Sequence, residues 1–198
     1  GVFIAQLMHA GALSQSLATT KAPSSVQPLG RKMPEYGGGE GMFPMPEAMN
    51  KHDIRNVIDG FIESAVNAYK SGFDGIEIHA ANGYLLDQFL TTYTNLRTDE
   101  YGGNVENRFR IIGEMITQIR EALPPDFILG LRLSEGKVNN MSYRWPEGAH
   151  MAKAILTEVM NQGKPDYIHI AAESGDWQRD CIYDDESSFT GLASKITG

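Results

Sequence analysis

The residues best suited to chemistry in this sequence stand in or near the ends of short apolar segments. Gln6, His79 and Arg132 each lie in such a segment, and Asn82 and Tyr84 come just after His79. The set offers two amides, an imidazole, a phenol and a guanidinium, and few carboxylates accompany them. Hydrogen-bond donors without a nucleophile suit a site that polarises a carbonyl group and holds an electron-rich cofactor.

Two other kinds of site fit the sequence poorly. A metal hydrolase needs histidines and carboxylates at the spacing of metal ligands, and no such cluster is evident, so we predict no metal site. A Schiff-base enzyme needs a lysine near a strand end, but the nearest one, Lys137, follows Glu135 and Gly136 in a predicted loop. His9 and His169 are single strand-end histidines, which we expect to be structural, with a modest chance of lining a cofactor pocket.

Four short apolar segments rich in β-branched residues are predicted to be strands. None of them alternates cleanly between apolar and polar residues, which is typical of parallel strands buried on both faces. The predicted strands are residues 2–8, 75–80, 128–133 and 167–171.

Three segments between these strands carry apolar residues every three or four positions and are predicted to be helices. Gly72 follows the first helix, where a left-handed cap is expected. Asn104 can cap the start of the second helix, and Pro124 ends it. The predicted helices are residues 52–70, 105–123 and 147–161.

Alternating strands and helices predict an α/β fold with a parallel sheet. Four strands in sequence fit half of a TIM barrel or a small doubly wound sheet. No G-x-G-x-x-G fingerprint follows a predicted strand, which argues against a dinucleotide-binding doubly wound unit. Residues 37–41 are glycine-rich but lie in a long loop, where such clusters usually form flexible connectors. In either fold, ligands gather at the carboxyl ends of the strands.

The composition excludes several classes of partner. The 198 residues include 17 Lys and Arg against 25 Asp and Glu, a formal charge of −8. A nucleic acid or an anionic membrane would require a basic face, so we expect neither partner. No apolar run is long enough to cross a bilayer, and no secretory signal opens the chain. The single cysteine, Cys181, permits no internal disulfide, has no visible activating base and is expected to be incidental, which favours a cytoplasmic protein.

Several motifs resemble those of the old yellow enzyme family of FMN-dependent ene-reductases. Residues 74–90, DGIEIHAANGYLLDQFL, closely resemble the family's signature, and NLRTDEYGG at 95–103 looks like its next motif. QLMHAG at 6–11 is similar to the family's third strand, and LRLS at 131–134 to its fifth. The resemblance runs in the family's order from residue 1 to about 172 and is weak in the loop 13–47 and after Glu173.

The resemblance implies two residues that contact FMN. The amide of Gln6 can donate and accept hydrogen bonds, which suits the pyrimidine edge of the flavin. Arg132 would lie near flavin N1 and the C2 carbonyl, where its permanent charge would stabilise the reduced ring. NADH or NADPH is the implied reductant.

The resemblance also implies how an α,β-unsaturated carbonyl substrate is bound and reduced. His79 and Asn82 would donate hydrogen bonds to the carbonyl oxygen and draw electron density from the β-carbon. Tyr84 would give a proton to the α-carbon as general acid. Met8 stands where the family often has Trp and would widen the substrate pocket, and Ala12 stands where it usually has Arg.

Other polar residues in these motifs are expected to be structural. Ser134 would lie near Arg132 without a catalytic role. A salt-bridged loop and helix start are expected from Arg97, Asp99, Glu106, Arg108 and Arg110.

The chain is about half as long as members of that family, so we expect a single partial (β/α)8 barrel over residues 1–198, truncated at both ends and holding about strands three to six. The loops that usually bind the FMN phosphate would then lie outside the sequence. Two alternatives stay open: a multidomain flavin and iron–sulfur relative of the dienoyl-CoA reductase or amine dehydrogenase type, and an inactive half-barrel. Self-association into a homo-oligomer is a further expectation, because a half-barrel has two open sheet edges.

Overall fold

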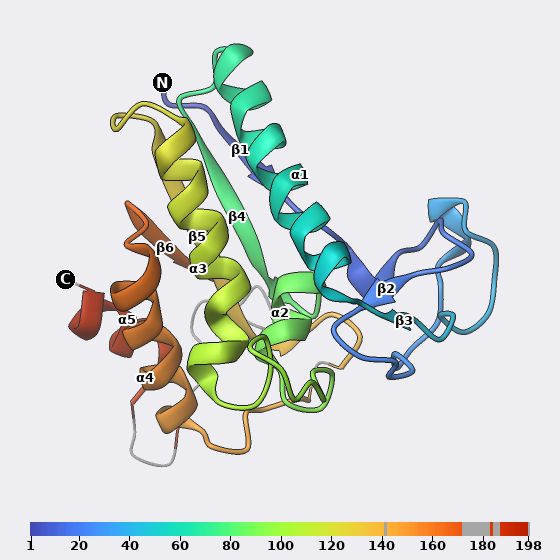
Figure 1. The fold of residues 1–198 in the computed structure, drawn as a ribbon. Coiled ribbons are helices and arrows are strands. Elements are labelled where there is room, and N and C mark those ends of the chain that lie inside the picture. The colour runs from blue at the N-terminus through green and yellow to red at the C-terminus, as the bar shows by residue number, and fades with distance from the viewer. Residues whose placement is uncertain (141, 172–182, 184–186, 198) are drawn as a thin grey trace.

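Four parallel strands form the central sheet, in the order β1, β4, β5, β6 (Figure 1). The computed structural model describes residues 1–140, 142–171, 183 and 187–197, so Glu173 and Cys181 lie outside the described residues. The predicted parallel sheet is confirmed at all four segments, with shorter first and last strands and longer middle ones. The strands are β1 (Ile4–Leu7), β4 (Gly75–Asn82), β5 (Ile128–Lys137) and β6 (Tyr167–Ile170).

Helices connect consecutive strands and lie along one face of the sheet (Figure 1). The three predicted helices are confirmed as α1 (Lys51–Lys70), α3 (Val105–Ala122) and α4 (Ala149–Glu158), and the last of them continues into a π-helical turn, η3 (Val159–Gly163). Two further helices are α2 (Leu85–Leu90), directly after β4, and α5 (Phe189–Thr197), after β6. Among the described residues, no helix combines the length and apolarity needed to span a bilayer.

The helix ends follow the sequence signals. Asn50 and Asp53 form a reciprocal capping box at the start of α1, and Gly72 follows its end with a φ of 85°. The side chain of Asn104 accepts a hydrogen bond of 2.9 Å from the Asn107 N–H at the start of α3. These caps satisfy backbone groups that have no partner inside a helix.

The two faces of the sheet differ in chemistry because side chains alternate along a strand. One face packs apolar residues such as Ile78, Leu131 and Leu133 against the helices, in a continuous core. The opposite face carries the polar side chains of Gln6, Glu77, His79, Arg132, Tyr167 and His169.

The long segment between β1 and α1 projects beside the sheet (Figure 1). It contains the 3-10 turns η1 (Gly11–Leu13) and η2 (Pro34–Tyr36) and the paired short strands β2 (Lys21–Ala22) and β3 (Glu47–Ala48). An antiparallel bridge joins Arg31 to Met42. The segment predicted as one long loop therefore has local order.

Candidate active site

The strand register aligns the predicted site residues on the polar face of the sheet. His79 of β4 pairs with Arg132 of β5, which pairs with His169 of β6. One row earlier, Gln6 of β1 pairs with Glu77 of β4. Gln6, His79 and Arg132 thus lie on the same face of three adjacent parallel strands.

His79 is buried, with 6% of its surface exposed, and its Nδ1 accepts a hydrogen bond of 3.2 Å from the Ala81 N–H. Burial, together with the neighbouring positive charge of Arg132, lowers the pKa of His79 to about 4. The imidazole is therefore neutral at pH 7. Because Nδ1 accepts, the proton of the neutral ring lies on Nε2, which becomes a hydrogen-bond donor.

Asn82 and Gly83 form a tight turn after β4, with φ angles of 62° and 84°. The Asn82 N–H donates to Ser134 Oγ at 2.7 Å, and the Asn82 carbonyl accepts from the Val138 N–H at 3.1 Å. Ser134 thus positions Asn82, a role more specific than proximity to Arg132. These bonds hold Asn82 in a left-handed conformation that asparagine tolerates better than most residues.

Tyr84 follows this turn and precedes the first residue of α2. Its ring packs edge-on against His79, with 5.3 Å between the ring centroids. The predicted trio of His79, Asn82 and Tyr84 therefore lies within one local structure at the carboxyl end of β4.

Gln88 of α2 ties this turn to the segment after β1. Its Nε2 donates to the Gly83 carbonyl at 2.7 Å, and its Oε1 accepts from the Ala12 N–H at 3.2 Å. Gly11 has a φ of 58°, and a β-carbon there would come within 2.4 Å of Gln88 Oε1. Glycine at this position lets the chain after β1 approach the turn at Asn82 and Gly83.

Lys137 is the residue whose predicted location is wrong. It is the last residue of β5 rather than part of a loop, because β5 continues beyond a register shift in β4 and pairs with Asn82. Its ammonium group lies 2.8 Å from Asp87 Oδ1, and the other carboxylate oxygen of Asp87 accepts the Gly83 N–H at 2.5 Å. A buried ion pair therefore stabilises the turn at Asn82 and Gly83.

Glu77 is a site residue that the sequence reasoning missed. Its Oε1 accepts from Gln6 Nε2 at 2.5 Å, and its Oε2 lies 3.2 Å from His169 Nδ1. Burial and then a hydrogen bond to Glu77 raise the pKa of Tyr167 to about 12. The sequence did contain a signal for this residue, because Glu77 is a carboxylate inside an apolar strand and buried acids are rare unless they are paired. Because Nε2 of Gln6 donates to Glu77, the Oε1 of that amide is the atom that can accept a hydrogen bond from a ligand.

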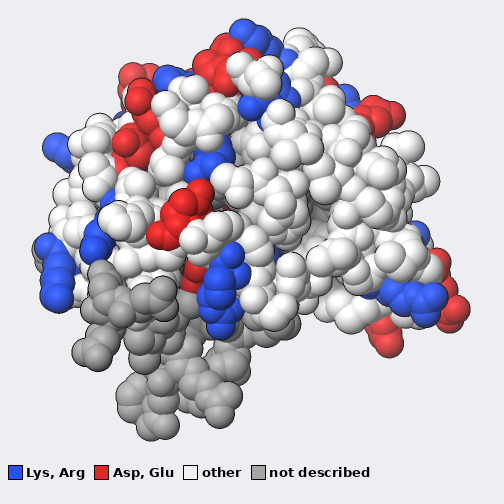
Figure 2. Space-filling model, turned by 90° about the horizontal axis from the view of Figure 1, so that it is seen from below, with Lys and Arg blue, Asp and Glu red and all other residues white. Residues whose placement is uncertain are grey.

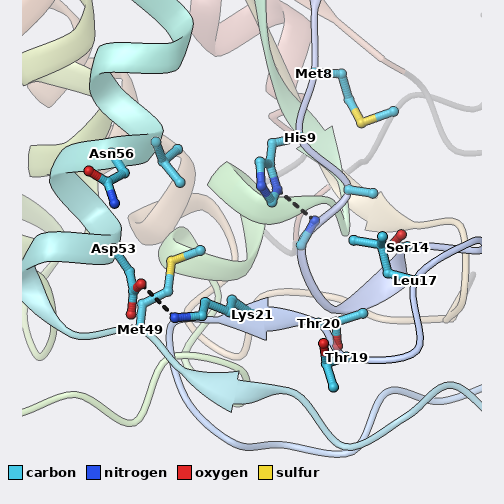
Figure 3. A pocket seen from close by; sticks show the side chains of 13 residues that line it. Met8, His9, Ser14, Leu17, Thr19, Thr20, Lys21, Met49, Asp53 and Asn56 are labelled. Atoms are coloured by element: carbon cyan, nitrogen blue, oxygen red, sulfur yellow. Dashed lines mark hydrogen bonds and ion pairs between the residues drawn. The ribbon is translucent and has the colours of Figure 1, made fainter.

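Met8 and His9 point to different sides of the chain (Figure 3). His9 lines a cavity of about 430 Å³ between the segment after β1 and α1, with its Nδ1 accepting from the Gly11 N–H at 3.0 Å. Lys21 and Asp53 form an ion pair of 2.5 Å in the same cavity (Figure 3). Met8 borders this cavity and also a second one beside Tyr84. His9 thus lies away from the row that contains His79.

The loop before α3 is only partly salt-bridged as predicted. Arg97 pairs with Asp99 at 2.5 Å, and Arg110 lies 3.7 Å from Glu106. Arg108 differs, because it is buried and its Nη2 contacts Met151 Sδ at 3.3 Å.

The face at the carboxyl ends of the strands carries scattered charges of both signs among uncharged residues (Figure 2). Across the described part of the chain, no group of three or more His, Cys, Asp or Glu residues could hold a metal ion. This face presents oriented hydrogen-bond donors, among them the Nε2–H of His79.

A parallel (β/α) sheet with such donors at its carboxyl end fits a segment of a TIM-barrel enzyme. The NADH:flavin oxidoreductase / NADH oxidase family model matches residues 1–194, and the chain belongs to this family. Structural neighbours confirm the partial barrel. Morphinone reductase superposes with a TM-score of 0.80 at 29% identity, over 99% of this chain and 53% of that one. An old yellow enzyme homologue from Zymomonas mobilis gives 0.76 at 27% identity, over 100% and 55%.

The names of curated relatives are consistent with membership of this family. A probable flavin mononucleotide-dependent alkene reductase of Leishmania infantum is 42% identical over 186 residues, which cover 88% of this chain and 50% of the relative. An NADH-dependent flavin oxidoreductase of Aspergillus parasiticus is 36% identical over 177 residues, which cover 86% and 36%. The chain thus spans half or less of the length of these relatives.

The residues on the polar face fit a flavin. The Nε of Arg132 is buried and has no hydrogen-bond partner among the described residues, so this donor is available to an acceptor outside them. Gln6 is exposed on the open side of the sheet, with its Nε2 already bound to Glu77. A cationic donor and an amide acceptor match a ring that has both carbonyl oxygens and an N–H on its pyrimidine edge.

Proposed function

We propose that this chain is the part of an FMN-dependent reductase that binds the substrate. The whole enzyme would use NADH or NADPH to reduce activated C=C bonds. The observation that carries the proposal is the neutral His79, whose Nε2–H is held as a donor beside Asn82 and Tyr84. The expected substrates are α,β-unsaturated carbonyl compounds. Gln6 and Arg132 would hold the flavin, with Met8 at the edge of the substrate pocket.

Each catalytic residue has a separate task. His79 Nε2–H and the Asn82 side-chain amide donate to the substrate's carbonyl oxygen and stabilise the negative charge that develops there. When bound, the reduced flavin supplies the hydride that adds to the β-carbon. The Tyr84 hydroxyl gives its proton to the α-carbon, and solvent restores that proton. NADH or NADPH provides the two electrons, so the reaction balances.

The relatives support this proposal by what their names state. One is called an alkene reductase, others 12-oxophytodienoate reductases, and one solved neighbour is morphinone reductase in complex with tetrahydroNAD. Each of these names describes reduction or a bound nicotinamide in that protein. A cytoplasmic location and a homo-oligomer remain predictions from the sequence.

The proposal is tested with the purified protein and FMN. We expect the flavin absorption spectrum to shift on binding, anaerobic NADH or NADPH to bleach it, and cyclohexenone to restore it. If NADH or NADPH bleaches the flavin but no enone reoxidises it, the proposal of ene-reductase activity is wrong. The family membership would not be affected. A protein that never binds FMN would support the alternative of an inactive half-barrel.

A further inference from the structure

Glu77 is a charged residue on the polar face of the sheet that the proposed mechanism does not use. Its side chain is 8% exposed, and it lies on β4 between Gln6 of β1 and Gly130 of β5. A buried carboxylate is costly unless hydrogen bonds and positive charges compensate for the water that it loses. An apolar side chain would cost less at this position, so the presence of a carboxylate points to a specific role.

Three side chains from β1 and β6 surround this carboxylate. Gln6 Nε2 donates to Oε1 at 2.5 Å, and His169 Nδ1 lies 3.2 Å from Oε2. Tyr167 also forms a side-chain hydrogen bond with Glu77. The ring of Tyr167 reaches across β5 over Gly130, where a β-carbon would come within 2.1 Å of the tyrosine Cζ. The strand register and one glycine thus fix the position of the carboxylate.

The Glu77 carboxylate decides which way the Gln6 amide faces. Within the described residues, the bond to Glu77 is the only hydrogen bond of the Gln6 side chain, and Gln6 is otherwise exposed. An ionised carboxylate can only accept hydrogen bonds, so it selects the orientation in which Nε2, and not Oε1, faces Glu77. If residue 77 carried a neutral amide, both orientations of Gln6 would have a partner.

Glu77 also lies close to Arg132. Gly130 is the register partner of Glu77, and Arg132 stands two positions after it, so the two charges lie one row apart on the same face of adjacent strands. Burial and the charge of Arg132 lower the pKa of His79, whereas the charge of Glu77 raises it. The two charges therefore act in opposite directions on the same site.

We propose that Glu77 is a positioning residue for the flavin. It holds Gln6 so that Oε1 accepts from the N–H on the pyrimidine edge of the ring. Its negative charge partly offsets that of Arg132, which limits how strongly the site favours the reduced flavin. The inference rests on the proposed function, because it takes Gln6 and Arg132 as the residues that hold FMN.

The first test is Glu77→Gln, which keeps the shape of the side chain but removes its charge and its preference for a donor. The affinity for oxidised FMN should fall about fivefold, the scale of one hydrogen bond. The ratio of the affinities for reduced and oxidised FMN should rise about tenfold, because a negative charge near an anionic ring is lost. Fluorescence titration measures the affinity, and a redox titration should show the change in the ratio as a higher reduction potential.

Two further variants separate this role from a merely structural one. In a Gln6→Ala background, Glu77→Gln should cause no further loss of affinity for oxidised FMN, because Glu77 acts on that affinity through Gln6. Glu63→Gln is the matched control, since Glu63 is exposed on α1, on the other side of the sheet. It removes the same charge and should change neither the affinity nor the reduction potential.

Two results would overturn the proposal: equal losses of affinity for oxidised and reduced FMN in Glu77→Gln, or additive losses in the double variant. The side-chain amide resonances of Gln6 in the isotope-labelled, unmodified protein give a test that needs neither FMN nor a variant. One N–H should be shifted downfield and should exchange slowly with solvent. Resonances typical of a free glutamine would contradict the contact with Glu77. If the protein binds no FMN, the proposed function fails separately, and these resonances still decide whether Glu77 orients Gln6.

Discussion

The Lys137 ammonium group lies 2.8 Å from Asp87 Oδ1, and the two side chains are 1% and 0% exposed. Asp87 also accepts the Gly83 N–H, and Lys137 pairs with Asn82 through the backbone. One buried ion pair therefore contacts two residues of the turn that presents Tyr84. Burial raises the pKa of Asp87, while the attraction of Lys137 opposes that shift.

Lys137→Met should destabilise the protein by about 3 kcal/mol at neutral pH, because it leaves a buried carboxylate without its counter-ion. The pKa of Asp87 should then rise further. A carboxyl group whose pKa is raised in the folded state stabilises that state at low pH and loses the effect as pH increases. Relative to the unmodified protein, the variant should therefore recover part of its stability as the pH is lowered from neutral, as measured by urea unfolding.

The double variant Lys137→Met with Asp87→Asn is the matched control. It keeps an acceptor for the Gly83 N–H but removes the titrating carboxyl group, so it should lack the recovery at lower pH that the single variant shows. A pH-independent deficit in the single variant would show that lost packing, not charge, is responsible.

Tyr84→Phe should slow enone reduction by about 10²-fold, the usual scale for loss of a general acid. Flavin reduction by NADH or NADPH should be almost unchanged, because no proton from Tyr84 is needed in that step. Stopped-flow absorbance of the two half-reactions separates the effects. Equal losses in both half-reactions would remove Tyr84 from the role of proton donor.

Asn82 allows structure and function to be separated, because its φ is 62°. Asn82→Gly should leave stability nearly unchanged, whereas Asn82→Ala should cost about 1 kcal/mol in backbone strain. Both variants lack the amide donor and should bind a phenol more weakly, because the oxygen of a phenol can accept the same hydrogen bonds as the substrate's carbonyl oxygen. The double variant His79→Ala with Asn82→Ala should show the weakest binding. Binding is followed by the change in flavin absorbance. Unchanged affinity in the double variant would show that His79 and Asn82 do not bind the substrate's carbonyl oxygen.

His79 should make folding pH-dependent in a defined window. Its pKa falls from 6.5 to about 4 in the folded protein, so the unfolded chain binds more protons between those values. Stability should therefore decrease as pH falls from about 6.5 to about 4, by at most about 3 kcal/mol. His79→Gln should show a smaller decrease in the same range. An NMR titration that found His79 protonated near pH 6.5 would contradict the neutral donor.

Local sequence patterns were enough to predict the four strands of the central sheet, three of the helices and the motif residues. Helix periodicity and caps such as Asn104 are local, because they depend on hydrogen bonds within a few residues. Buried parallel strands have continuous apolar runs, so their positions were also readable from composition. The spacing of His79, Asn82 and Tyr84 identified the candidate trio, because all three belong to one short motif.

Only the tertiary structure decided which distant residues support that trio. Asp87 and Lys137 are 50 positions apart, and their pairing depends on a register shift near the end of β4 that no local pattern reveals. The orientation of Gln6 by Glu77 likewise requires the alignment of two strands. Arg31 lines the cavity beside Tyr84 because of how the segment between β1 and α1 is folded. The sequence of that segment has little helical or strand periodicity. Contacts of this kind depend on strand register and loop packing, and those are set by the whole core rather than by neighbouring residues.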